Sequence, residues 1–155
     1  MDILIVSTED MCRSRMAQAI LLSLGRGMKI FTAGVAEGSA LPDIVRQVMQ
    51  QEGYELAGKR PTSLSVYASQ PWDVLITLSK EAEEECRICA VKAKDEFHLA
   101  FDDALCGRTD EEHEVNIRRL YDEMHRSLYE LYRDELSEKL MPACTCGANT
   151  YCRCE

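Results

Sequence analysis

The N-terminal segment most strongly constrains the fold, because a short apolar run passes through a turn directly into a helix. Residues 2–7 contain the run Ile3-Leu4-Ile5-Val6, which has the length and the β-branched content of a buried strand. From Ser14, which can cap a helix, apolar side chains recur at helical spacing up to the stop signal Gly25. The sequence therefore predicts a strand over residues 2–7 and a helix over residues 14–25.

The same alternation continues along the chain. Further strands are predicted over residues 28–33, 73–79 and 97–101, and helices between Pro42 and Gly53 and over residues 110–140. Alternating strands and helices indicate an α/β fold, a doubly wound sheet of four parallel strands flanked by helices. Such sheets bind ligands at the carboxyl ends of their strands, where the strand order reverses. We expect this domain to span residues 1–140 and a cysteine-rich tail to span residues 141–155.

Charge and apolar run length limit the partners and the compartment. The formal net charge is -9, with 27 acidic against 18 basic residues, which argues against nucleic acid and anionic membranes as partners. The apolar opening is shorter than the roughly 7–15 residues of a secretory signal, and a spanning helix needs about 20. We therefore expect a cytoplasmic protein whose 8 cysteines are thiols or metal ligands.

The turn after the first strand has the layout of an oxyanion site. Its backbone N–H groups and the start of the next helix would face a common point, which suits an anion. Arg13 adds a planar fork that can bind two oxyanion oxygens, although a surface cation is the alternative interpretation of this side chain. The predicted oxyanion-binding residues are Thr8, Glu9, Asp10, Met11, Cys12, Arg13 and Ser14.

With this turn, the sequence resembles the low-molecular-weight protein tyrosine phosphatases and the thioredoxin-coupled arsenate reductases that share their fold. The family's loop reads Cys-x5-Arg-Ser after the first strand, and this chain has Ser7-x5-Arg13-Ser14. Two further segments are closest to the arsenate-reductase branch: Ile76-Thr77-Leu78-Ser79 followed by Cys86, and His98-Leu99-Ala100-Phe101-Asp102-Asp103. The resemblance implies the nucleophile position at Ser7, oxyanion binding by Arg13, a general acid at Asp103, and no required cofactor. It also implies a small oxyanion (phosphate, arsenate or sulfate) or a phosphoprotein as ligand.

Several positions depart from the family pattern. Ser7 stands where the family has its nucleophilic cysteine, and loss of a nucleophile can cost on the order of 10^6 in turnover. Glu9 and Asp10 replace Gly-Asn, and each carboxylate about 7 Å from a bound anion would oppose it by roughly 2 kcal/mol. The second and third cysteines of the thioredoxin-coupled relay correspond to Ser79 and Cys86, so the relay that implies thioredoxin as a partner is incomplete.

These departures leave three functional hypotheses. The first is a pseudoenzyme, a catalytically impaired binding or regulatory member of the family. The second is an active tyrosine phosphatase or arsenate reductase with engineered Cys-to-Ser changes at positions 7 and 79. In the third, Cys12 acts as a displaced nucleophile beside Arg13. Asp103 is followed by Ala104 where the family usually has proline, so a solvated turn at Asp102-Asp103 is the alternative to an acid loop.

The remaining cysteines suggest weaker hypotheses. Cys86 and Cys89 have C-x-x-C spacing, but the acidic helical run over residues 81–85 would raise the pKa of these thiols. The tail cysteines can supply four thiolates to zinc, with disulfides or incidental thiols as alternatives. The candidate zinc ligands are Cys144, Cys146, Cys152 and Cys154. His98, His113 and His125 lack ligand spacing and are interpreted as structural or surface residues.

Overall fold

Four parallel strands form the centre of the protein, which is described by a computed structural model over residues 1–56 and 60–140. The strands are β1 (Asp2–Ser7), β2 (Lys29–Gly34), β3 (Pro71–Thr77) and β4 (Lys92–His98). Their spatial order is β2-β1-β3-β4, and every neighbouring pair runs parallel. The predicted doubly wound α/β sheet is confirmed.

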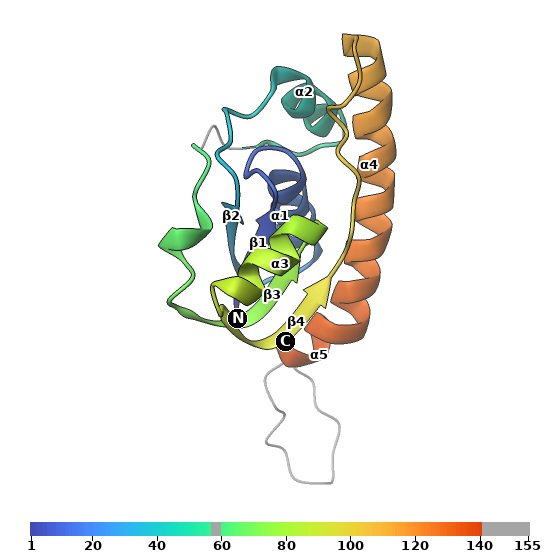
Figure 1. The fold of residues 1–155 in the computed structure, drawn as a ribbon. Coiled ribbons are helices and arrows are strands. Elements are labelled where there is room, and N and C mark those ends of the chain that lie inside the picture. The colour runs from blue at the N-terminus through green and yellow to red at the C-terminus, as the bar shows by residue number, and fades with distance from the viewer. Residues whose placement is uncertain (57–59, 141–155) are drawn as a thin grey trace, which may run out of the picture.

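Helices cover both faces of this sheet (Figure 1). They are α1 (Arg13–Leu24), α2 (Asp43–Gln51), α3 (Lys80–Ile88) and α4 (Asp110–Leu131), with a short 3-10 turn, η1 (Leu64–Val66), before β3. The helix predicted over residues 110–140 continues beyond α4 as a π turn (Tyr132–Leu136) and α5 (Ser137–Leu140). No helix in residues 1–56 and 60–140 combines the length and apolar character that a membrane crossing requires.

The alternation of side chains along β1 divides the core into two layers. Ile3 and Ile5 pack into the cluster that contains the inner faces of α1 and α4. Leu4 and Val6 point to the opposite face and pack into the cluster formed with α3 and η1. All four side chains are fully buried, which explains why this strand is a continuous apolar run.

The fourth strand differs from the prediction. It spans Lys92–His98, whereas the sequence predicted residues 97–101. No apolar run marks this strand, because β4 lies at the edge of the sheet and alternates exposed charged side chains such as Lys94 and Glu96 with half-buried ones. The predicted and observed strands share only Phe97 and His98.

The reversal of strand order lies at β1, between β2 on one side and β3 on the other. The carboxyl end of β1 leads into the turn at residues 8–12, and the end of β2 lies directly beside this turn. A Cβ atom on Gly34 would lie 2.6 Å from the backbone nitrogen of Asp10, so only glycine permits this approach. The fold thus places the predicted oxyanion loop at the position where doubly wound sheets bind ligands.

Candidate oxyanion-binding site

Backbone hydrogen bonds turn two carbonyl groups of the loop away from its centre. The carbonyl of Ser7 accepts a bond from the Val35 amide at 3.2 Å, and that of Thr8 accepts bonds from Val35 and Ala36 at 3.1 and 2.8 Å. Several loop amides donate to no acceptor within the described part of the chain, namely those of Glu9, Asp10, Cys12 and Arg13. Unused amides beside the start of α1 are the donors that an anion-binding loop requires.

The Ser7 side chain is buried at the end of β1. Its hydroxyl donates to the Glu9 carbonyl oxygen at 2.6 Å, and the Met11 amide donates to the same oxygen at 2.9 Å. A carbonyl oxygen orients the hydroxyl but is too weak a base to remove its proton. A serine nucleophile needs an adjacent base, so Ser7 is held in place without being activated.

The Asp10 carboxylate points into the protein and is compensated by a second arginine. Its Oδ1 accepts from the Ser14 hydroxyl at 2.8 Å, and its Oδ2 accepts from the Arg15 guanidinium at 3.2 Å and from the Thr62 amide at 2.9 Å. Both members of the Asp10–Arg15 ion pair are buried. The expectation that Asp10 adds an uncompensated charge against a bound anion is therefore wrong, whereas Glu9 is half-buried in the loop.

Arg13 connects the loop with the segment that follows β4. Its Nη1 donates to the Phe101 carbonyl oxygen at 2.8 Å, and the Phe101 amide donates to the Leu78 carbonyl at 3.1 Å. This segment brings Asp103 close enough for its charge to act on Cys12. The Asp103 carboxylate is exposed and accepts a hydrogen bond from the Leu105 amide at 2.9 Å, as in a local turn.

Cys12 lacks the surroundings of a nucleophilic thiolate. It is 5% exposed, and its thiol contacts the Met16 sulfur at 3.8 Å. The pKa of Cys12 is raised from 9.0 to about 12, mainly by burial and in second place by the Asp103 charge, and Arg13 offsets only part of this rise. A nucleophilic cysteine needs a lowered pKa, so these features argue against Cys12 as a displaced nucleophile.

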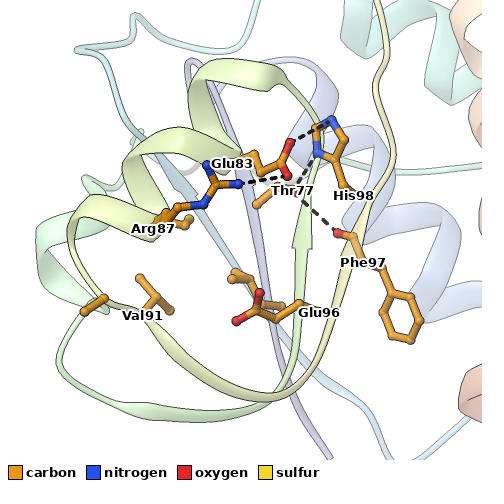
Figure 2. Close-up of a pocket in the computed structure, with 10 residues that line it drawn as sticks. Thr77, Glu83, Arg87, Val91, Glu96, Phe97 and His98 are labelled. Atoms are coloured by element: carbon orange, nitrogen blue, oxygen red, sulfur yellow. Dashed lines mark hydrogen bonds and ion pairs between the residues drawn. The ribbon is translucent and has the colours of Figure 1, made fainter.

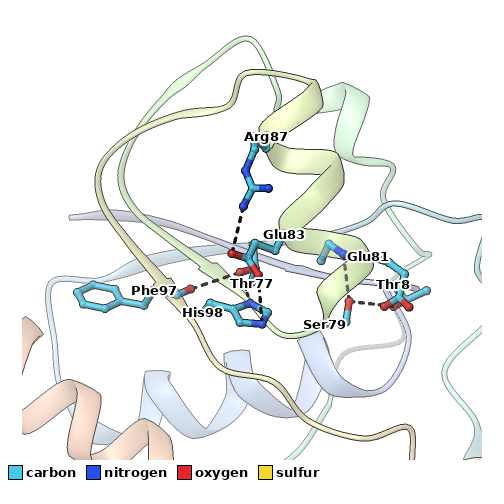
Figure 3. Close-up of polar contacts among 9 residues, drawn as sticks. Thr8, Thr77, Ser79, Glu81, Glu83, Arg87, Phe97 and His98 are labelled. Carbon is cyan, nitrogen blue, oxygen red and sulfur yellow. Dashed lines mark hydrogen bonds and ion pairs between the residues drawn. The ribbon is translucent and has the colours of Figure 1, made fainter.

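The two predicted relay positions lie apart: Ser79 is the N-cap of α3 (Figure 3), whereas Cys86 lies in the last turn of this helix. The Ser79 hydroxyl accepts from Thr8 Oγ1 at 2.9 Å and caps α3 by accepting the Ala82 amide at 3.2 Å. Cys86 lies seven residues further along the chain, or about 10 Å along the helix axis. Ser79 therefore contacts the loop, and Cys86 packs in the core.

No disulfide joins the cysteines of residues 1–56 and 60–140: Cys12, Cys86, Cys89 and Cys106 are all thiols. Burial is the main cause that raises the pKa of Cys86 to about 12, followed by the charges of Cys89, Glu96 and Glu85. Of the acidic run over residues 81–85, only Glu85 contributes to this rise, after burial and the charges of Cys89 and Glu96. The four candidate zinc ligands, at positions 144, 146, 152 and 154, lie outside the described residues.

A pocket of about 350 Å³ lies between α3 and β4 (Figure 2). Four of its polar side chains form one chain of contacts: Thr77 Oγ1 with His98 Nδ1 at 2.9 Å, His98 Nε2 with Glu83 at 3.4 Å, and Glu83 with Arg87 at 3.3 Å. Both ring nitrogens of His98 thus contact protein groups. This geometry supports the interpretation of His98 as a structural residue that links β3, β4 and α3.

Sequence reasoning missed Arg15, the Thr62 amide and the Phe101 carbonyl as parts of the site. A backbone group carries no sequence signal of its own. Arg15 did have one, because it is a charged residue between Ser14 and the core residue Met16, and all three are buried on α1. A cation in that position indicates a buried anionic partner, and Asp10 is the acid that provides it.

Comparison with known proteins shows the family of this chain. Residues 2–140 match the family described as low molecular weight phosphotyrosine protein phosphatase. An arsenate reductase from Bacillus subtilis (strain 168) is 28% identical over 125 residues, which cover 79% of this chain and 88% of the relative.

Two solved structures share the fold. The arsenate reductase from Archaeoglobus fulgidus DSM 4304 has a TM-score of 0.66 at 19% identity, covering 85% of this chain and 99% of the other. A Cys-to-Ser mutant of an arginine phosphatase with a phosphorylated active-site serine has a TM-score of 0.57 at 18% identity, covering 91% and 100%. The protein with this loop at the end of β1 belongs to the low molecular weight phosphotyrosine protein phosphatase family.

Proposed function

We propose that this chain is a catalytically impaired family member that binds a phosphate-type oxyanion and does not turn it over. The observation that carries the proposal is the Ser7 hydroxyl, which stands at the nucleophile position and donates to the Glu9 carbonyl at 2.6 Å. A hydroxyl has a far higher pKa than a thiol, and no basic side chain of the described residues contacts it. The surrounding loop keeps unused amides and an arginine, which are the groups that bind an oxyanion.

The ligand that these groups favour is a small tetrahedral oxyanion or a phosphorylated side chain of a protein. The family is described by its action on phosphotyrosine, and the Bacillus subtilis relative is an arsenate reductase. Thioredoxin-coupled reduction is disfavoured here, because Ser79 stands at one relay position and Cys86 is buried about 10 Å further along α3. A regulatory role follows, in which the protein sequesters a phosphorylated group or responds to its binding.

A second candidate is favoured by the arginine phosphatase mutant, whose active-site serine is phosphorylated. In this role Ser7 would accept a phosphoryl group: the Ser7 Oγ–phosphorus bond forms, the bond from phosphorus to the leaving group breaks, and the hydroxyl proton passes to the leaving group. The absence of a thiolate makes this transfer slow, and the phosphoserine would persist. Peptide mass spectrometry after incubation with p-nitrophenyl phosphate would detect one phosphoryl group on Ser7, with Ser7→Ala as the control.

Turnover assays test the main proposal. We would measure p-nitrophenyl phosphate hydrolysis and thioredoxin-dependent arsenate reduction for the unmodified chain, for Ser7→Cys, and for Ser7→Cys with Ser79→Cys. The unmodified chain should show no turnover, and Ser7→Cys should gain phosphate-ester hydrolysis because the loop and Arg13 can stabilise a thiolate. The matched control is Ser69→Cys, which changes an exposed serine just before β3, at the opposite edge of the sheet from the loop, and should remain inactive.

Two outcomes of these assays would overturn the proposal. Hydrolysis by the unmodified chain at the rate of Ser7→Cys would show that the hydroxyl suffices for catalysis. Turnover by the unmodified chain that disappears in Cys12→Ala would assign the chemistry to the buried thiol instead.

A further inference from the structure

We propose that the buried Asp10–Arg15 ion pair positions the oxyanion loop and cancels the charge that Asp10 brings to it. The inference rests on the proposed function, because it names the residues that shape the binding loop without contacting the ligand. Asp10 and Arg15 are thus positioning residues.

Asp10 joins three segments of the chain. One carboxylate oxygen accepts from the Ser14 hydroxyl on the first turn of α1 at 2.8 Å. The other accepts from Arg15 on the same helix at 3.2 Å and from the Thr62 amide at 2.9 Å, in the segment beside the end of β2. The side chain of a loop residue is thereby held by groups of two other segments, which limits the movement of its own backbone.

This anchoring leaves two backbone amides of the loop without a protein acceptor in the described part of the chain. The backbone amide of Asp10 donates to no acceptor in the described part of the chain, and the adjacent Glu9 amide is also unused there. The close approach of Gly34 to the Asp10 nitrogen leaves the peptide little room to turn. The anchored carboxylate therefore restricts the peptide groups that carry these unused amides, which are free to donate to an anion.

The charge of Asp10 is balanced by Arg15 inside the protein. The side chains of Arg15 and Asp10 are 4% and 0% exposed, so water screens neither charge and each needs its partner. Arg15 Nη2 also donates to the Arg60 carbonyl oxygen at 2.9 Å, so a second protein group holds the same nitrogen. A neutral buried pair has little net effect on a nearby anion, unlike a solvent-facing carboxylate in the same loop.

The substitution Asp10→Asn separates positioning from repulsion. Asparagine stands at this position in the family that the loop resembles; its carbonyl oxygen can still accept from Arg15 and Thr62, but it carries no charge to balance the buried Arg15. If the ion pair positions the loop, Asp10→Asn weakens the binding of inorganic phosphate by about tenfold, because the buried Arg15 loses its counter-charge and no longer holds the loop in place. If Asp10 instead repels the ligand, the same substitution tightens binding.

Two further variants complete the test. Glu9→Gln removes the neighbouring half-buried acid, for which no ion pair is found among the described residues, and should bind phosphate more tightly at an unchanged melting temperature. The double variant Asp10→Asn with Arg15→Gln replaces the charged pair by a neutral pair and should recover most of the affinity lost in Asp10→Asn. It also keeps the test valid if Asp10→Asn alone unfolds.

The experiment is a titration with inorganic phosphate by calorimetry, well below the melting temperature of each full-length variant. Weaker binding by Asp10→Asn and recovery in the double variant support the inference. Unchanged or tighter binding by Asp10→Asn overturns the inference alone, since phosphate binding by the unmodified chain still supports the proposed function. An unmodified chain that binds no phosphate overturns the proposed function, and the inference with it.

Discussion

The guanidinium of Arg13 lies against the Phe101 carbonyl oxygen, with 2.8 Å between Nη1 and O. This bond links the first residue of α1 to the segment that carries Asp102 and Asp103. An arginine has five N–H donors, so Arg13 can keep this contact while it binds an oxyanion with its remaining donors. Arg13 therefore holds the segment after β4 beside the loop and still has donors for a ligand.

The substitution Arg13→Lys tests this dual role. A lysine keeps the charge but loses the planar fork, so the affinity for inorganic phosphate should fall by about tenfold. Arg26→Lys changes an exposed arginine outside the site and should bind like the unmodified chain. Calorimetric titration measures both, and equal affinities for the two variants would remove Arg13 from the binding site.

The Cys12 thiol should resist alkylation. Its burial and its raised pKa of about 12 keep it protonated at pH 8 and shielded from reagents. Cys106 is exposed and provides the internal comparison. After brief treatment with iodoacetamide at pH 8, peptide mass spectrometry should find Cys106 modified and Cys12 intact; equal labelling would revive the hypothesis of a displaced thiol nucleophile.

Ionisation of Cys12 should also contribute to alkaline unfolding. The pKa of Cys12 is raised to about 12 in the folded protein against 9.0 ordinarily, so between these values the unfolded thiol loses its proton while the folded one keeps it. The stabilisation from the neutral buried thiol is complete below pH 9 and is lost as the pH rises toward 12, by at most about 1.4 kcal/mol per pH unit.

Urea unfolding at pH 8.5 and pH 10.5 measures this effect. The free energy of unfolding of the unmodified chain should fall by roughly 2 kcal/mol more than that of Cys12→Ala. Cys106→Ala, at an exposed position, should retain the full pH dependence. An identical fall in the unmodified chain and in Cys12→Ala would show that the thiol titrates normally.

The contact between Thr8 and Ser79 joins the oxyanion loop to α3 (Figure 3). Ser79→Ala removes both this bond and the cap of α3, so it should lower the free energy of unfolding by about 1–2 kcal/mol. Ser69→Ala at an exposed position should change it by less than about 0.5 kcal/mol. Thermal or urea unfolding compares the two, and equal stabilities would mean that the cap and the contact contribute nothing.

The main elements of the fold could be predicted from the sequence, because their side chains repeat with the period of the structure. Ile3 to Val6 are buried on both faces of the sheet, and Met16, Ile20 and Leu21 follow the buried face of α1. β4 was misplaced because an edge strand alternates exposed and half-buried residues and lacks such a run.

The position of the site in the fold could be predicted from the sequence, but most of its side-chain and backbone contacts could not. The order strand, turn, helix with Arg13 located the loop. The sequence could not show that Asp10 faces inward toward Arg15 and Thr62, since Thr62 is 52 residues away and contributes a backbone amide. Asp10 was therefore predicted to oppose the ligand, whereas the fold neutralises its charge.

Backbone NMR of the unmodified, 15N-labelled chain during titration with inorganic phosphate tests most directly whether this loop binds an oxyanion. Binding in the loop predicts saturable shifts of the amide signals of Glu9, Asp10, Cys12 and Arg13, and no such shifts in Arg13→Ala. Loop signals that remain unchanged up to saturating phosphate, or that shift equally in Arg13→Ala, would contradict it.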